Sequence, residues 1–303
     1  MGEVAGGSKS EGLNGSSGGR ASFGVRLTGA VVRTGPLCAG IDPSSSILAE
    51  WGLTDDAAGL GEFGYRCVDA FADVVPVVKP QVAFFERHGA AGLGALESLI
   101  VAARSAGLLV ITDAKRGDIG STMDAYASAW LSDDSPLAGD AVTALPYLGL
   151  GACQPMIDLA ASTGRGVIVV VRSSNPEGRA LQQALTASKN GAGLLVSVED
   201  MLLGQLADLN AGGTVPPGTL GAVVGATLDP SGFDLSTLGG PILAPGLGAQ
   251  GGTAAGVAAL FGGCPYGSVV ASTSRSLLAA GPDVESLRKA AIEARDEVGA
   301  ALA

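Results

Sequence analysis

The sequence of 303 residues predicts a single-domain α/β fold, the (β/α)8 TIM barrel, on three observations. Short and almost continuous apolar runs recur along the chain, as is typical of parallel strands buried on both faces. Helical patterns separate most of these runs, with about 30 residues to each strand–helix unit. Eight such units match a (β/α)8 barrel. Because strand number alone does not prove closure, a doubly wound open sheet is the alternative fold.

Each predicted strand is an apolar run of four or five residues. In chain order the runs are Leu37–Ile41, Val74–Val78, Leu108–Thr112, Ala141–Leu145, Val167–Val171, Ala222–Gly225, Pro241–Ala244 and Ser268–Ala271. The helical patterns cover 60–73, 94–106, 121–131, 153–162, 195–209, 254–261, 274–280 and the amphipathic stretch 284–301.

Residues 1–24 are expected to form a flexible tail rich in glycine and serine, and residues 25–303 the barrel domain. No apolar run reaches the ~18 residues of a transmembrane helix, and the N-terminus lacks the apolar region of a signal peptide. The net charge of −11, from 18 basic and 29 acidic residues, argues against binding to nucleic acids or anionic membranes.

Histidine and cysteine are too sparse to carry most site chemistry. His88 is the one histidine, and the four cysteines, Cys38, Cys67, Cys153 and Cys264, form no CxxC pair, so most zinc sites are excluded. The scattered cysteines are expected to be reduced core residues, which suits a cytoplasmic protein. Acid–base chemistry would then depend on carboxylates and on the five lysines.

The most informative stretch reads VITDAKRGDIGST. A strand is expected to end at Asp113, and alternation along an extended chain would put Lys115 on the same face. Asp118 follows in a glycine-bracketed loop, and Ser121 with Asp124 forms a capping pattern for the next helix. Two carboxylates and an ammonium group would therefore meet at the carboxyl end of a barrel strand, where active sites of this fold lie.

Two other charged residues end buried runs in the same way. Lys79 ends VVPVVK and Asp42 follows LCAGI, although lysine is rarely buried without a partner. Lys79, Asp113, Lys115 and Asp118 sum to zero charge, so the set tolerates dehydration. The alternative is a purely structural salt-bridge network at the barrel mouth.

A phosphate site is predicted where TIM barrels often have one, in the loops after strands seven and eight. The seventh strand leads into the glycine-rich turn 245–252, whose backbone N–H groups precede a helix N-terminus. Arg275 follows the eighth strand and offers a planar fork that pairs well with phosphate.

The segment DAKRGDIGST resembles the D-x-K-x-x-D signature of the orotidine 5′-phosphate decarboxylases. GIDPS, VVKPQVAFFERHG, PYLG, SSNPEG, APGLGAQGG and STSR occur in the order expected of the family's longer bacterial-type branch, so the resemblance covers about residues 35–285. It implies conversion of orotidine 5′-monophosphate to UMP and CO2 in pyrimidine biosynthesis, with no cofactor and no metal.

By this resemblance Lys115 would protonate C6 of the pyrimidine and Asp113 would lie beside the substrate carboxylate. Lys79 would orient Asp113 and the ribose, and Asp42 would bind a ribose hydroxyl. Asp118 would act in the site of a second subunit, which implies a homodimer with shared active sites.

Further substrate contacts are implied for residues in the loops. Across the dimer interface they are Ile119 and Thr122. At the phosphate they are Gln250, Gly251 and Arg275. Ser174 would read the amide edge of the pyrimidine, with Ser173 as the alternative serine. Gln81 would either line the pocket or pack a loop, whereas Arg172 is expected to be solvated.

Three other functions remain possible on this sequence. The first is a related phosphosugar enzyme, such as a hexulose-phosphate synthase or a keto-gulonate-phosphate decarboxylase, which would need Mg²⁺. The second is a Schiff-base aldolase that uses Lys115 or Lys79. The third is a non-catalytic barrel that binds a nucleotide phosphate through the glycine-rich turn and Arg275.

Overall fold

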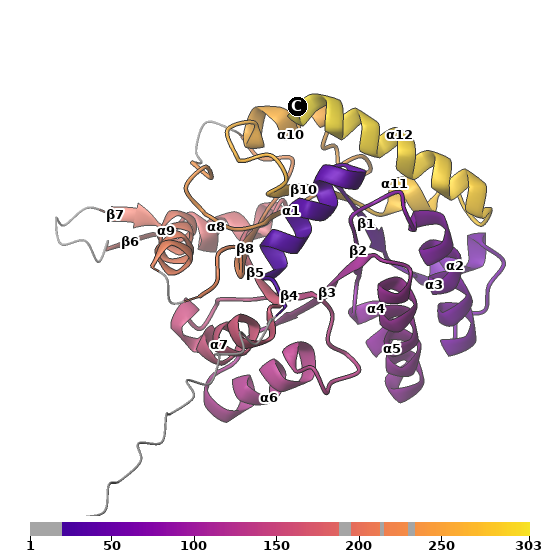
Figure 1. Cartoon of the computed structure of the whole chain (residues 1–303), viewed down its shortest axis with the longest axis horizontal. Helices are drawn as coiled ribbons and strands as arrows, with labels where there is room; N and C mark the ends of the chain where they lie inside the picture. Colours follow the sequence, from indigo (N-terminus) through magenta and orange to yellow (C-terminus); the bar gives the residue numbers. More distant parts are fainter. Residues whose placement is uncertain (1–19, 188–194, 213–214, 230–233) are drawn as a thin grey trace, which may run out of the picture.

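The computed structural model describes residues 20–187, 195–212, 215–229 and 234–303 and forms a closed parallel barrel ringed by helices (Figure 1). Its strands are β1 (Leu37–Ile41), β2 (Val77–Pro80), β3 (Leu109–Arg116), β4 (Ala141–Ala144), β5 (Gly166–Arg172), β8 (Leu220–Val224), β9 (Ile242–Pro245) and β10 (Val269–Thr273). Each pairs with its neighbours in chain order, and β10 pairs with β1 in the register Leu37 to Ala271. This closure confirms the (β/α)8 barrel and excludes the open sheet.

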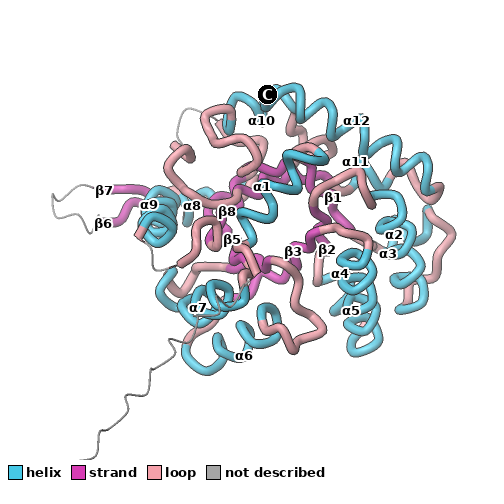
Figure 2. The backbone as a smooth tube through the Cα atoms, viewed as in Figure 1, coloured by secondary structure: helices cyan, strands magenta, loops and turns pink. Residues whose placement is uncertain are grey.

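The helices surround the ring of strands, except for α1, which lies across one open end of the ring (Figure 2). They are α1 (Phe23–Thr34), α2 (Ser45–Glu50), α3 (Ala57–Phe71), α4 (Ala83–Glu86), α5 (Gly89–Ser105), α6 (Gly120–Leu131), α7 (Gln154–Thr163), α8 (Arg179–Gln182), α9 (Val198–Ala211), α10 (Ala254–Phe261), α11 (Arg275–Leu278) and α12 (Val284–Leu302). Within the described ranges, no helix has the length and apolar character needed to cross a membrane.

All eight predicted strands are present. The first has the predicted ends, and the other seven begin or end at different residues than predicted. The second strand begins at Val77 rather than Val74, and the third continues through the DAKR segment to Arg116. Part of the predicted helix 195–209 is wrong, because Leu195–Ser197 forms β7, which pairs with β6 (Leu185–Ala187) in an antiparallel hairpin. The helix α9 starts only after Ser197, whose hydroxyl accepts the Asp200 N–H at 3.0 Å as an N-cap.

Helix α1, which the strand and helix patterns above did not include, closes the amino-terminal end of the barrel. Its residues Phe23, Leu27 and Val31 are fully buried. They pack against one interior side chain from every barrel strand: Cys38, Val77, Ile111, Ala141, Ile168, Val223, Leu243 and Val270. Residues 1–19 of the predicted tail lie outside the described residues. Residues 20–22 lead into α1, and the last two residues of the predicted tail, Phe23 and Gly24, belong to the helix, so the barrel domain begins earlier than predicted.

Candidate active site

The segment that carries the aspartate–lysine motif is a bulge in β3. The register between β3 and β4 runs from Thr112 opposite Val142 to Arg116 opposite Ala144. Lys115 has a φ of 48°, in the left-handed region that residues other than glycine seldom adopt. The expectation of a straight extended strand was therefore wrong at Lys115. The bulge nevertheless brings the Lys115 Nζ to 2.6 Å from the Asp113 Oδ1.

Asp113 accepts hydrogen bonds from four side chains. Lys79 Nζ and Gln81 Nε2 donate to Oδ2 at 2.8 and 3.1 Å. Lys115 Nζ and Thr143 Oγ1 donate to Oδ1 at 2.6 and 2.8 Å. Burial alone would raise the pKa of the Asp113 carboxyl, but the two ammonium groups and their hydrogen bonds outweigh it and hold the pKa well below its usual range. Asp113 is therefore a permanently ionised group at neutral pH.

Lys79 is the buried partner of this carboxylate. Its side chain is only 9% exposed and that of Asp113 only 7%. Burial would lower the pKa of Lys79, yet the negative charges of Asp113 and Asp42 outweigh burial and hold the pKa above its usual value. The pair therefore stays charged inside the barrel mouth, where each charge depends on the other.

These charges line a pocket of about 260 Å³ at the carboxyl ends of the strands. Of the eleven predicted site residues it contains seven: Asp42, Lys79, Asp113, Lys115, Ser174, Gln250 and Arg275. Ser173 also lines it, so both candidate serines face the same space. Gly251 is the neighbour of Gln250 but does not line the pocket.

Two polar atoms of this pocket are buried without a hydrogen-bond partner, the Asp42 Oδ1 and the Ser274 Oγ. Such atoms are rare in folded proteins unless a ligand or water satisfies them. A closed salt-bridge network would leave no such atoms, so the pocket fits a polar ligand better than a purely structural role.

The glycine-rich turn has the backbone that its sequence predicts. Gly246 and Gly248 have φ values of 111° and 78°, which only glycine adopts without strain. The turn is fixed to the start of α11 by a hydrogen bond from the Ala249 N–H to the Ser276 Oγ at 2.9 Å. Arg275 therefore lies beside the turn at one end of the pocket.

Asp118, Ile119 and Thr122 do not line the pocket of their own chain. Asp118 accepts the Ile119 N–H at 2.8 Å, and Ile119 is 61% exposed at the N-cap position of α6. The predicted Ser121–Asp124 cap was wrong, because α6 begins at Gly120 and Ser121 lies inside it.

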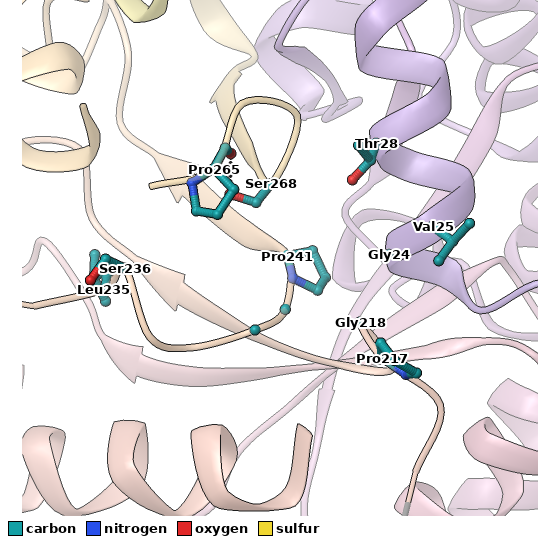
Figure 3. Close-up of a pocket in the computed structure, with 12 residues that line it drawn as sticks. Gly24, Val25, Thr28, Pro217, Gly218, Leu235, Ser236, Pro241, Pro265 and Ser268 are labelled. Carbon is teal, nitrogen blue, oxygen red and sulfur yellow. Dashed lines mark hydrogen bonds between the residues drawn. The ribbon is translucent and has the colours of Figure 1, made fainter. Parts of the chain in front are cut away.

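A second pocket, of about 350 Å³, lies at the opposite end of the barrel beside α1 (Figure 3). Its lining is mostly glycine, proline and apolar side chains. The hydroxyls of Thr28 and Ser268 already donate to the carbonyls of Gly267 and Pro265. No titratable side chain belongs to the described lining, so this pocket is not the candidate active site.

Three residues have contacts that differ from the sequence-based expectation or go beyond it: Gln81, Thr143 and Arg172. Gln81 both lines the pocket and donates to Asp113, which decides between its two interpretations. Thr143 was not among the predicted site residues, although a hydroxyl in an otherwise apolar strand can indicate a buried polar contact. Arg172 was expected to be solvated, but it is 7% exposed and its Nη1 lies 3.1 Å from the Glu199 Oε2. His88 lies 3.3 Å from Asp55 and outside the pocket.

Several known proteins are similar to this chain in sequence and in fold. Residues 35–290 match the model of the "Orotidine 5'-phosphate decarboxylase / HUMPS family". An orotidine 5′-phosphate decarboxylase of Salinispora arenicola is 52% identical over 93% of this chain and 98% of its own length. One from Streptomyces coelicolor is 51% identical over 89% of this chain and 94% of its own length.

Solved structures agree with this match. A Streptomyces avermitilis protein whose proposed name is orotidine 5′-phosphate decarboxylase is 48% identical, covers 96% of this chain and 99% of its own, and has a TM-score of 0.87. The Leishmania donovani OMP decarboxylase is 28% identical, covers 92% of this chain and 98% of its own, and has a TM-score of 0.69. On this evidence the chain belongs to the orotidine 5′-phosphate decarboxylase / HUMPS family.

Proposed function

We propose that this protein decarboxylates orotidine 5′-monophosphate to UMP and CO2, the step of pyrimidine biosynthesis performed by a carboxy-lyase. The observation that carries the proposal is the ionised Asp113 held between two lysines on the wall of a pocket with unpartnered polar atoms. The full-length matches to orotidine 5′-phosphate decarboxylases support it.

The chemistry needs a cation at the reacting carbon. When the bond from C6 to the carboxylate breaks, its electron pair stays on C6 while CO2 leaves, and no neighbouring carbonyl delocalises that charge. The Lys115 ammonium stabilises the developing carbanion and then transfers a proton to C6. Water returns the proton to Lys115. No cofactor enters this sequence of steps.

Asp113 has two roles in this mechanism. It holds the Lys115 Nζ at 2.6 Å, which fixes the proton donor. It also lies beside the substrate carboxylate, whose negative charge disappears as CO2 forms, so that repulsion present in the ground state is relieved. Lys79 keeps Asp113 ionised and in place, and Asp42 accepts a ribose hydroxyl through the unpartnered Oδ1.

The remaining contacts hold the nucleotide by its two ends. The phosphate binds at the glycine-rich turn through Gln250 and Arg275, which line the pocket, with Gly251 as a further contact beside Gln250, and the planar guanidinium pairs with phosphate oxygens. Ser174 reads the amide edge of the pyrimidine at the end of β5. Binding energy from the phosphate contacts, which take no part in the reaction itself, serves to position C6 against Lys115.

A second subunit completes the site. Asp118, Ile119 and Thr122 lie outside their own chain's pocket, the first two on the segment that joins β3 to α6 and Thr122 in the first turn of α6. Exposed apolar side chains lie on this segment and the neighbouring β4 loop, namely Ile119, Leu145, Tyr147 and Leu148. A homodimer would cover them and deliver Asp118 to the partner's pocket. The four cysteines are all free, which supports a cytoplasmic location.

The test is the loss of absorbance of orotidine 5′-monophosphate with purified wild type, Lys115→Ala and Lys289→Ala. The first variant removes the proton donor, so we expect the rate to fall by at least about 10³-fold. Lys289 is 78% exposed on α12 and serves as the matched control, with an unchanged rate. Equal rates for wild type and Lys115→Ala would exclude the proposed role.

The related phosphosugar reactions are tested in the same preparation. Full activity on orotidine 5′-monophosphate in EDTA is expected. Activity that requires a metal ion and uses a sugar phosphate instead would overturn the assignment. Trapping of substrate on Lys115 by borohydride would indicate a Schiff base and an aldolase.

A further inference from the structure

The bulge in β3 interrupts the regular ladder of backbone hydrogen bonds on the side that faces β4. Between the paired residues Thr112 and Arg116, the segment 113–115 faces a single residue of β4, which is Thr143. A buried backbone N–H in such a segment needs another acceptor, because an unsatisfied N–H in the interior is costly.

Thr143 supplies that acceptor with its side chain. Its Oγ1 accepts the Lys115 backbone N–H at 3.0 Å. The same hydroxyl donates its proton to the Asp113 Oδ1 at 2.8 Å. A hydroxyl has one proton and accepts through its lone pairs, so both functions are used at once. The residue is 1% exposed, and these contacts are not shared with solvent.

The two hydrogen bonds of the Thr143 hydroxyl fix both the backbone and the side-chain end of Lys115. The backbone amide is held by Thr143, and the Nζ is held by the Asp113 oxygen to which Thr143 donates. Lys115 has a left-handed φ of 48°, a conformation that persists in a non-glycine residue only when its surroundings enforce it. The hydrogen bond from the Lys115 amide is the contact that enforces it on the β4 side.

We propose that Thr143 is a positioning residue, which sets the place of the Lys115 ammonium and the Asp113 carboxylate through its single hydroxyl. Thr143 does not itself line the pocket, and it acts through Asp113 and Lys115, which do. The inference rests on the proposed function for its catalytic consequence, although its structural part does not depend on any activity.

The catalytic test compares Thr143→Val, Thr143→Ser and Thr112→Val. Valine keeps the shape and removes the hydroxyl, so kcat is expected to fall about 10- to 100-fold. The affinity for UMP should change less than about threefold, because the phosphate and ribose contacts remain. Serine restores the hydroxyl and most of kcat. Thr112 is the matched control, since it is equally buried and donates only to the Ala141 carbonyl, at 3.1 Å.

A second measurement is independent of activity. Protein labelled with [15N]lysine gives signals from only five lysine amides, and Lys115→Arg identifies that of Lys115. In Thr143→Val this amide should exchange its hydrogen faster by about tenfold or more, whereas Thr143→Ser and Thr112→Val should keep the slow rate. If wild type is inactive on orotidine 5′-monophosphate, the proposed function fails while this exchange result still decides the role of Thr143.

Any of four results would overturn the proposal. Three concern kcat: a wild-type value in Thr143→Val, an equal loss in Thr112→Val, or a loss that Thr143→Ser does not recover. The fourth is an unchanged exchange rate of the Lys115 amide in Thr143→Val. Should Thr143→Val fail to fold, as judged by its urea transition, Thr143→Cys replaces it, because a thiol is only a weak donor and acceptor.

Discussion

Asp113 shows how a single side chain concentrates the chemistry of this barrel. Its donors come from three successive strands and the residue that follows one of them: Lys79 and Gln81 with β2, Lys115 on β3 and Thr143 on β4. Two of the four donors are cations, and the carboxylate in turn keeps the buried Lys79 charged. Removal of Asp113 should therefore disturb folding as well as catalysis.

Asp113→Asn should lower the free energy of unfolding at pH 7 by about 3–5 kcal/mol, because it leaves the Lys79 ammonium buried without its carboxylate. The measurement is urea denaturation of the apo protein. The matched control is Glu293→Gln, which breaks a lysine–carboxylate pair whose side chains are 78% and 68% exposed. It should change stability by less than about 1 kcal/mol. A similar small change in Asp113→Asn would contradict the buried pair.

The same variant should reverse the pH dependence of stability in alkali. In wild type the pKa of folded Lys79 lies above the unfolded value of about 10.4, so its stabilisation is complete below that pH and is lost as the pH rises through the folded pKa. In Asp113→Asn burial dominates and the folded pKa drops below the unfolded value. Relative to wild type, the stability of Asp113→Asn should then rise with pH between about 8 and 10. The measurement is the difference in urea midpoint between the two proteins, because the buried cysteine thiols, whose pKa burial raises, contribute to both. A difference that stays constant or widens with pH would disagree with this assignment.

At the residue level, the charged groups of the site could be predicted from the sequence, but the buried residues that hydrogen-bond or pair with charged groups could not. Lys79 and Asp113 end apolar runs and Lys115 follows two positions after Asp113, and that pattern is visible without any structure. Thr143 acts only because the bulge in β3 places it opposite residues 113–115, and register is not encoded in a single strand's pattern. Arg172 likewise gained a buried partner, Glu199, from an element far along the chain.

At the level of elements, the eight strands could be predicted because each is buried on both faces and has a continuous apolar run. The hairpin β6–β7 could not, since its strands of three residues are too short to show alternation. Helix α1 carried a usable signal: its buried residues Phe23, Leu27, Ala30 and Val31 follow the helical period. The period begins directly after the glycine-rich residues 1–20, whose composition is typical of a tail.

Helix α1 should contribute strongly to the stability of the barrel, because it covers the interior side chains of all eight strands. Leu27 is fully buried, so Leu27→Ala should lower the free energy of unfolding by about 2–5 kcal/mol. Val32 lies on the same helix at 64% exposure, and Val32→Ala should cost less than about 0.5 kcal/mol. Thermal or urea unfolding measures both. Equal costs would show that α1 does not seal the barrel as described.

At the scale of the whole molecule, charge is distributed in two opposite ways. The chain carries a net charge of −11, yet in the pocket the cations Lys79, Lys115 and Arg275 outnumber the carboxylates of Asp42 and Asp113. This local positive charge suits a dianionic phosphate ester, whereas the acidic remainder disfavours polyanions such as nucleic acids.

The shared site of the proposed dimer can be tested by mixing two inactive chains. Lys115→Ala and Asp118→Ala, combined with subunit exchange, should give hybrid dimers with one intact site. Random pairing then restores about a quarter of wild-type activity. Lys115→Ala mixed with Lys79→Ala is the control: both lesions lie in the pocket of their own chain, so no hybrid site is intact. No recovery in the first mixture would exclude a cross-subunit Asp118.

The pairing of β1 with β10 has a consequence for how the protein is made. Leu37 pairs in register with Ala271, so the first strand to leave the ribosome has no partner on this side until the last strand has been made. Until then β1 presents an unpaired edge, and the growing chain can form only an open, partial sheet. The barrel closes only after β10 has been synthesised. A chain truncated before β10 would keep β1 as an exposed strand edge, which can pair with a strand of another chain and lead to aggregation.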